Sequence, residues 1–177
     1  MSEKENSEDL TSQANELKRY FTKDELVKIM GTTFSLGPSY VLLISILSKT
    51  GIRLGELDNL NLENILIDTN QLLVKNKSGE RRIPIDKELI EQILSYNRPR
   101  TTGPIFVGYK TQKAFVPATF NKMIKQVSVE SGIEFKPYKF RITCAHNMLA
   151  QGVKREEILK NMGWSNESIL DRINLVS

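Results

Sequence analysis

The apolar segment from Ser39 to Lys49 is the feature that most constrains the fold of this chain. It is long enough for a helix and apolar enough to predict that the helix is buried. Its longest apolar run, Val41 to Leu47, is far shorter than the roughly 20 residues that a membrane span needs. Gly51 follows and is expected to end the helix, because glycine readily adopts the left-handed conformation of a helix C-cap. The segment therefore predicts a core helix and no membrane span.

The pattern changes from helical to extended between residues 65 and 85. Three short segments, 65–67, 72–74 and 81–85, are separated by the turn sequences 68–70 and 77–79. Short strands joined by tight turns predict a small three-stranded antiparallel sheet. Helices are expected at 22–30, 39–49, 54–57, 86–96, 117–131, 139–151, 155–162 and 167–174. The predicted fold class is therefore α+β, mostly helical, with one small sheet.

The chain of 177 residues can build one core but not two comfortable ones. Residues 1–20 are polar and are expected to form a disordered tail, and residues 21–177 are expected to form the domain. The tail holds five acidic and three basic residues, so of the net charge of +4 it carries −2 and the remaining chain +6. A basic domain favours a phosphate-rich partner such as a nucleic acid.

Several classes of site are not supported by the sequence. Cys144 is the only cysteine, which excludes an internal disulfide and agrees with an intracellular setting. His146 is the only histidine and is interpreted as structural, and without a histidine–cysteine cluster a metal site is not expected. No glycine-rich phosphate loop is present, so no nucleotide cofactor is expected.

Two arginines lie where a helix begins, and each allows two interpretations. Arg53 follows the helix-ending Gly51 and either binds an anion or pairs on the surface with Glu56 or Glu63. Arg141 lies in the first turn of a helix, where a cation opposes the helix dipole. It either offsets that cost by holding an anion or extends its charged end to solvent.

A basic strip on the predicted hairpin consists of Lys75, Lys77, Arg81 and Arg82. These side chains either contact phosphates or are simply solvated. Lys75, Arg81 and Arg82, together with Lys139, are the candidate DNA-binding residues of the chain.

Taken together and in order, these pieces resemble the catalytic domain of the tyrosine recombinase (phage integrase) family. The elements that carry the resemblance are Thr-Gly-x-Arg-x-x-Glu-Leu at 50–57, a hairpin lysine, Arg141 at a helix start, Gly152, and Gly163-Trp164 before the last helix. The separation between Arg141 and Trp164, 164 − 141 = 23, is usual in that family. The resemblance spans roughly Phe21 to the C-terminus and implies the DNA breaking–rejoining fold.

The resemblance implies a role for each of these side chains. Arg53 and Arg141 would clamp the non-bridging oxygens of a DNA phosphodiester, because guanidinium stays charged and offers forked donors. Lys77, with Lys75 as a rival, would act as general acid toward the leaving oxygen. Trp164 would pack against the phosphate, and Glu56 would buttress Arg53.

The chain departs from the family pattern in three ways. Tyr138 stands where the family usually has histidine, and a phenol with a pKa of about 10 is a poor base near neutrality. The nucleophilic tyrosine should fall at Ile173 or Asn174, and no tyrosine follows Tyr138. The separate N-terminal DNA-binding domain is also expected to be lacking, since 20 polar residues cannot replace it.

Three functions agree with these features. The first is an integrase-like protein of DNA integration and recombination that binds DNA but does not cleave it alone. The second is a pocket completed in trans by a tyrosine from another recombinase protomer. The third is a non-enzymatic protein-interaction module. The first two imply DNA as partner, no cofactor, and a cytoplasmic or nucleoid-associated protein.

Overall fold

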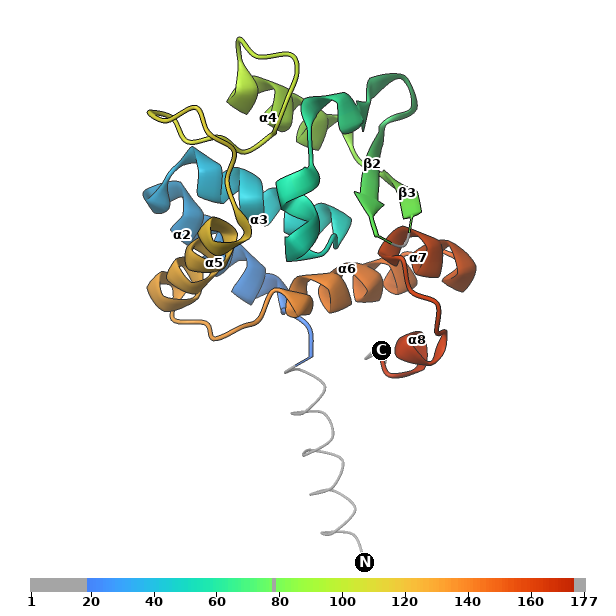
Figure 1. Ribbon diagram of the computed structural model, residues 1–177. Helices are drawn as coiled ribbons and strands as arrows, with labels where there is room; N and C mark the ends of the chain where they lie inside the picture. Colours follow the sequence, from blue (N-terminus) through green and yellow to red (C-terminus); the bar gives the residue numbers. More distant parts are fainter. Residues whose placement is uncertain (1–18, 78, 174–177) are drawn as a thin grey trace, which may run out of the picture.

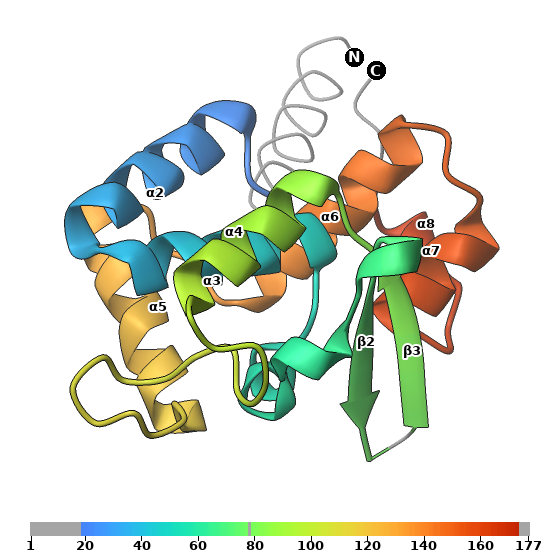
Figure 2. The same ribbon diagram turned by 90° about the horizontal axis from the view of Figure 1, so that it is seen from above.

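In the computed structural model, which describes residues 19–77 and 79–173, three helices pack around one central helix (Figures 1 and 2). This helix, α3 (Pro38–Thr50), contacts α2 (Lys23–Leu36), α4 (Lys87–Asn97) and α6 (Tyr138–Ala150). Its residues 42–47 are all buried, which confirms the core helix predicted from the apolar run. Gly51 caps it with a φ of 61°, and its N–H donates to the Leu47 carbonyl.

The first described helix begins with the predicted capping box. The Thr22 hydroxyl accepts from the Glu25 N–H at 3.1 Å, and the Glu25 carboxylate accepts from the Thr22 N–H at 2.9 Å. The expected tail, 1–20, lies outside the described residues except for Arg19 and Tyr20. Tyr20 is buried and stacks on His146, with ring centroids 4.0 Å apart. His146 thus has a packing role, as its interpretation required.

The predicted sheet is present as β1 (Ile65–Leu66), β2 (Gln71–Asn76) and β3 (Gly79–Pro84), antiparallel in that order. The register pairs Val74 with Arg81 and Leu73 with Arg82. Because side chains alternate across a sheet, Arg81 shares the inner face with the buried Val74, whereas Arg82 shares the outer face with Leu73. Adjacent arginines therefore point in opposite directions.

The C-terminal third forms a second small core beside the main one. It is built by α6, α7 (Arg155–Met162) and α8 (Ser168–Asp171), and its buried residues are Cys144, Ala145, Ile158, Met162, Leu170 and Ile173. The last helix was predicted at 167–174 and is shorter, running from Ser168 to Asp171. Arg155 pairs with the carboxylates of Glu167 and Asp171 near its two ends.

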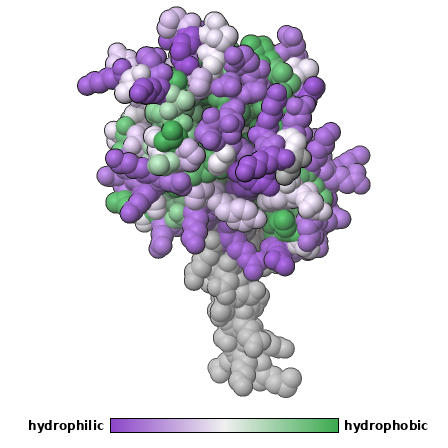
Figure 3. All heavy atoms as spheres, in the orientation of Figure 1, coloured by the Kyte–Doolittle hydropathy of each residue, from purple (hydrophilic) through white to green (hydrophobic). Residues whose placement is uncertain are grey.

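The remaining helices are α5 (Pro117–Ser131), which contacts α2, and three 3-10 turns, η1 (Leu54–Asn59), η2 (Leu62–Asn64) and η3 (Ile67–Thr69). The fold is α+β and mostly helical, with one small three-stranded antiparallel sheet, as predicted. The face seen in Figure 3 is largely hydrophilic. No helix among the described residues has the length and apolarity needed to cross a bilayer.

Candidate functional site

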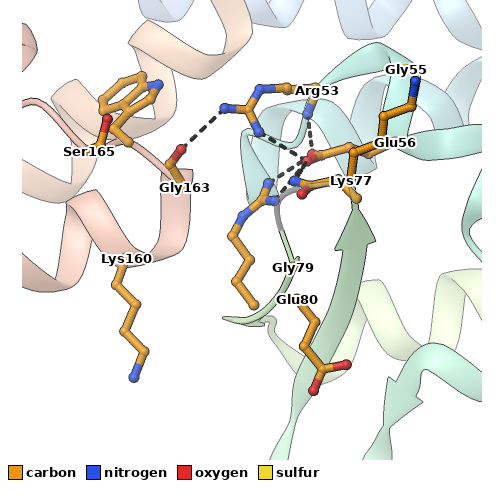
Figure 4. A pocket seen from close by; sticks show the side chains of 12 residues that line it. Arg53, Gly55, Glu56, Lys77, Gly79, Glu80, Lys160, Gly163 and Ser165 are labelled. Atoms are coloured by element: carbon orange, nitrogen blue, oxygen red, sulfur yellow. Dashed lines mark hydrogen bonds and ion pairs between the residues drawn. The ribbon is translucent and has the colours of Figure 1, made fainter.

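An open cavity of about 700 Å³ lies between η1, the β2–β3 hairpin and the loop that follows α7 (Figure 4). Arg53, Lys77 and Trp164, three of the predicted catalytic residues, line it from three distant parts of the sequence. A smaller cavity of about 260 Å³ shares Arg53 and Trp164 and is also lined by Tyr138 and Arg141. The fold therefore brings all five predicted catalytic residues to one pair of adjoining cavities.

Glu56 is the hub of the larger cavity. Its carboxylate accepts two hydrogen bonds from Arg81, at 2.7 Å from Nη1 and 2.8 Å from Nη2. It also accepts from the Asn76 amide at 3.0 Å, the Arg53 backbone N–H at 2.8 Å and Arg53 Nη1 at 3.2 Å. Burial alone would raise the pKa of the Glu56 carboxyl, but these bonds outweigh it and lower the pKa to about 2. Glu56 is thus a fixed anion that orients Arg53, as the sequence predicted.

Three arginines donate hydrogen bonds to the C-terminal end of α7, each to a different one of three consecutive backbone carbonyls. Arg81 Nε donates to the Asn161 carbonyl at 2.9 Å, Arg141 Nη2 to the Met162 carbonyl at 2.6 Å, and Arg53 Nη2 to the Gly163 carbonyl at 3.2 Å. Helix C-terminal carbonyls have no partner within the helix and carry the negative end of its dipole. The C-terminal end of α7 therefore stabilises the three guanidinium cations that bind to it.

Arg141 is buried, with 3% of its surface exposed, so it does not extend to solvent. Its Nη1 donates to the Gly51 carbonyl at 2.5 Å, which joins the end of α3 to the end of α7. Its Cζ lies 5.4 Å from the centroid of the Trp164 ring. Burial, followed by the repulsion of nearby Arg53, lowers the pKa of the Arg141 guanidinium to about 10. Even so, the group stays protonated at neutral pH.

The charges at the site do not cancel. Three guanidinium groups, on Arg53, Arg81 and Arg141, face the single carboxylate of Glu56, which leaves an excess of 3 − 1 = 2 positive charges. Lys77 and Lys160 also line the larger cavity and outnumber its second carboxylate, that of Glu80. An excess of fixed cations with forked donors suits a phosphate or phosphodiester. Among the described residues, no group of three or more histidine, cysteine or acidic side chains could hold a metal ion.

The structure separates the expected DNA-binding residues. Arg81 was expected on the surface, but only 8% of its side chain is exposed and its donors are engaged by Glu56 and Asn161. Arg82 and Lys75 are exposed on the outer face of the hairpin, because they alternate with the inward-facing Arg81 and Val74. Of the hairpin lysines, Lys77 lines the cavity and Lys75 does not.

Lys139 also differs from its expected place. Its ammonium lies 3.6 Å from Glu25 and 4.6 Å from the centroid of the Phe21 ring, and 13% of its side chain is exposed. It therefore holds the start of α2 against α6, away from both cavities, because the step of two residues between it and Arg141 turns its side chain by about 200° around the helix.

Asn76, Lys160 and Ser165 also line the larger cavity and were not predicted. Strand alternation was the available signal for Asn76, since it lies two residues after the inward-facing Val74. Ile173, at one of the two positions where the nucleophile was expected, is buried in the second core, and Asn174 lies outside the described residues.

The chain is similar in sequence and fold to known proteins. The profile of the Phage integrase family matches residues 19–173. The tyrosine recombinase XerA of Pyrococcus horikoshii is 29% identical over 176 residues, covering 91% of this chain and 61% of that protein. The XerA of Pyrococcus furiosus is 30% identical over 141 residues, covering 75% of this chain and 49% of that protein. The chain thus spans about half to three fifths of the length of these relatives.

Solved structures with the same fold include a crystal structure of XerA recombinase, with a TM-score of 0.74 at 22% identity, covering 88% of this chain and 60% of that one. A second is the XerH site-specific recombinase bound to difH substrate in a pre-cleavage complex. Its TM-score is 0.72 at 15% identity, and the match covers 89% of this chain and 50% of that one. At these identities the likeness shows the fold, and the profile match shows the family.

Proposed function

The chain belongs to the phage integrase family, and from this premise we propose that it binds DNA and holds one phosphodiester between Arg53 and Arg141 for strand exchange. The observation that carries the proposal is the net positive charge of the two adjoining cavities, whose two carboxylates, Glu56 and Glu80, are outnumbered by five cationic side chains, Arg53, Lys77, Arg81, Arg141 and Lys160. DNA is the partner that such a site fits, because its backbone is a regular array of singly charged phosphodiesters. A nucleoid-associated location follows from that partner.

The proposed chemistry is transfer of a phosphoryl group from a DNA oxygen to a tyrosine oxygen. As the tyrosine oxygen bonds to phosphorus and its proton passes to solvent, the bond to the 5′-oxygen breaks, and that oxygen takes a proton from the general acid Lys77. Negative charge grows on the two non-bridging oxygens, where Arg53 and Arg141 stabilise it. Tyr138, half exposed beside Arg141, supplies one hydrogen bond to the same phosphate.

The tyrosine itself is expected to come from outside these 177 residues, since none follows Tyr138 and Ile173 is buried. The retained pocket favours completion in trans by another recombinase protomer over a pure interaction module. A decayed pocket would have lost its uncompensated arginines first, because buried like charges destabilise a fold that does not use them.

DNA binding is expected to be salt-sensitive and to depend on Arg53. Because half of its side chain is accessible, Arg53→Ala tests the pocket with less disturbance than the buried Arg141. We expect the variant to bind duplex DNA about tenfold more weakly at low salt and to reduce the salt slope by about 1. Fluorescence anisotropy with a labelled duplex at two salt concentrations measures both. Arg141→Ala should also weaken the binding of duplex DNA.

Lys28→Ala is the matched control, because Lys28 is an exposed cation on α2 and lines neither cavity. Equal losses of DNA affinity for Arg53→Ala and Lys28→Ala would show that DNA binding depends on the net charge of the protein and not on this pocket. No binding by the wild-type protein at low salt would remove DNA from its function and leave the interaction module as the better account.

Strand cleavage is expected only when a tyrosine is supplied. On a nicked DNA substrate that traps covalent intermediates, the 177-residue protein alone should yield no protein–DNA adduct in denaturing gels. A partner recombinase with an intact tyrosine and inactivated arginines should yield an adduct when this chain is added, and Arg53→Ala should abolish it. An adduct that survives Arg53→Ala would exclude this pocket from the mechanism.

A further inference from the structure

We propose that Arg81 is a positioning residue of the phosphate pocket: through Glu56 and the Asn161 carbonyl it holds Arg53 and the end of α7 in register. This inference rests on the proposed phosphate-binding function of the same pocket. Arg81 lines the larger cavity but not the smaller one that Arg141 lines, and no role in phosphate contact is assigned to it. Its proposed role comes from the two groups that its guanidinium connects, the Glu56 carboxylate and the Asn161 carbonyl.

The first contact of Arg81 fixes the orientation of Glu56. Nη1 and Nη2 bond the two carboxylate oxygens in the parallel, forked geometry that arginine forms best. The same two oxygens then accept from Arg53, so the carboxylate plane set by Arg81 determines where the Arg53 guanidinium lies. Figure 4 shows these dashed contacts converging on Glu56.

The second contact fixes the end of α7. Arg81 Nε donates to the Asn161 carbonyl, two residues before the Gly163 carbonyl that Arg53 uses. Gly163 has a φ of 62°, and a Cβ added there would lie 3.3 Å from Cδ and Nε of Arg81. The arginine thus lies directly over this turn. Arg81 therefore sets both acceptors of Arg53, the Glu56 carboxylate and the Gly163 carbonyl, without touching Arg53 itself.

Trp164 provides a direct reading of this geometry. It is the only tryptophan of the chain, it follows Gly163, and it lines both cavities. Its fluorescence emission and its quenching by acrylamide report on the pocket without any DNA present. If Arg81 positions the end of α7, Arg81→Met should shift this emission and increase the quenching in the folded protein.

The test compares Arg81→Met with Arg82→Met, which removes the same charge from the opposite face of the same strand. We expect Arg81→Met to weaken DNA binding about tenfold and the control Lys28→Ala by about twofold or less, while Arg82→Met serves as the control for the Trp164 emission. The decisive measurement is a double-mutant cycle with Arg53→Ala. The about tenfold effect of Arg53→Ala should fall to about twofold in the Arg81→Met background, because Arg53 is already misplaced there.

Circular dichroism confirms the fold of each variant before its affinity is used. If Arg81→Met does not fold, Arg81→Lys replaces it, because lysine keeps the charge but cannot bridge both Glu56 oxygens and Asn161. Purely additive effects of the Arg81 and Arg53 substitutions, with unchanged Trp164 emission, would overturn the proposal. Wild-type protein that binds no DNA, yet whose Trp164 responds to Arg81→Met and not to Arg82→Met, would overturn the proposed function and support the positioning role.

Discussion

Replacing Glu56 by alanine is expected to lower the free energy of unfolding by about 3–5 kcal/mol, a large part of the stability of a domain of this size. The side chain is 4% exposed, and it is the partner of an Arg81 side chain that is only 8% exposed. Without the carboxylate, Arg81 remains buried with an unpaired charge beside Arg141, and Asn76 and Arg53 lose an acceptor. Urea unfolding followed by circular dichroism measures the change.

Two further variants separate the contribution of the pair from that of a lost carboxylate. Glu91→Ala removes an exposed carboxylate on α4 and should change the stability by no more than about 0.5 kcal/mol. The double replacement Glu56→Leu with Arg81→Met removes both buried charges and should recover most of the loss. A loss of under about 1 kcal/mol for Glu56→Ala would contradict the description of Glu56 as the hub.

The same hub explains why the fold was easier to predict than the site. Helix ends follow local signals, and the Thr22 capping box and the left-handed Gly51 were therefore predictable. The sheet was predictable from its turns. The bonds that hold the arginines to α7 join residues 80 and 110 positions apart, for Arg81 and Arg53 respectively. No local pattern encodes such pairs.

The resemblance to a family supplied what local patterns could not, because Arg53 and Arg141 came together only through the order of motifs. It did not distinguish Arg81 from Arg82, which differ only in the face of the strand they occupy. A signal was nevertheless present, since Arg81 lies two residues before the buried Ile83. The prediction for Lys139 failed for a related reason. Arg141, two residues further along α6, lies on the face of the helix that reaches the smaller cavity, and Lys139 lies on a different face.

Acid is expected to destabilise the protein through Glu56 in a defined range of pH. The pKa of its carboxyl is lowered from an ordinary value of 4.5 to about 2. Above pH 4.5 the carboxylate is charged in both the folded and the unfolded chain, so its full stabilising effect is present. Between pH 4.5 and 2 the unfolded chain takes up the proton first, and the stabilising effect falls as the pH falls. The shift corresponds to roughly 3 kcal/mol in total.

Glu56→Gln isolates this effect from the other carboxylates, because it keeps the side-chain shape but does not titrate. The difference in unfolding free energy between wild type and Glu56→Gln should be constant from about pH 7 to 5 and should narrow steadily below about pH 4.5. Asp86, whose pKa is also lowered, titrates in both proteins and cancels in the difference. A difference that stayed constant down to pH 3 would mean that Glu56 has an ordinary pKa and that Arg81 does not hold it. The forked pair would then contribute little, and Arg53 would have to be oriented by the Gly163 carbonyl alone.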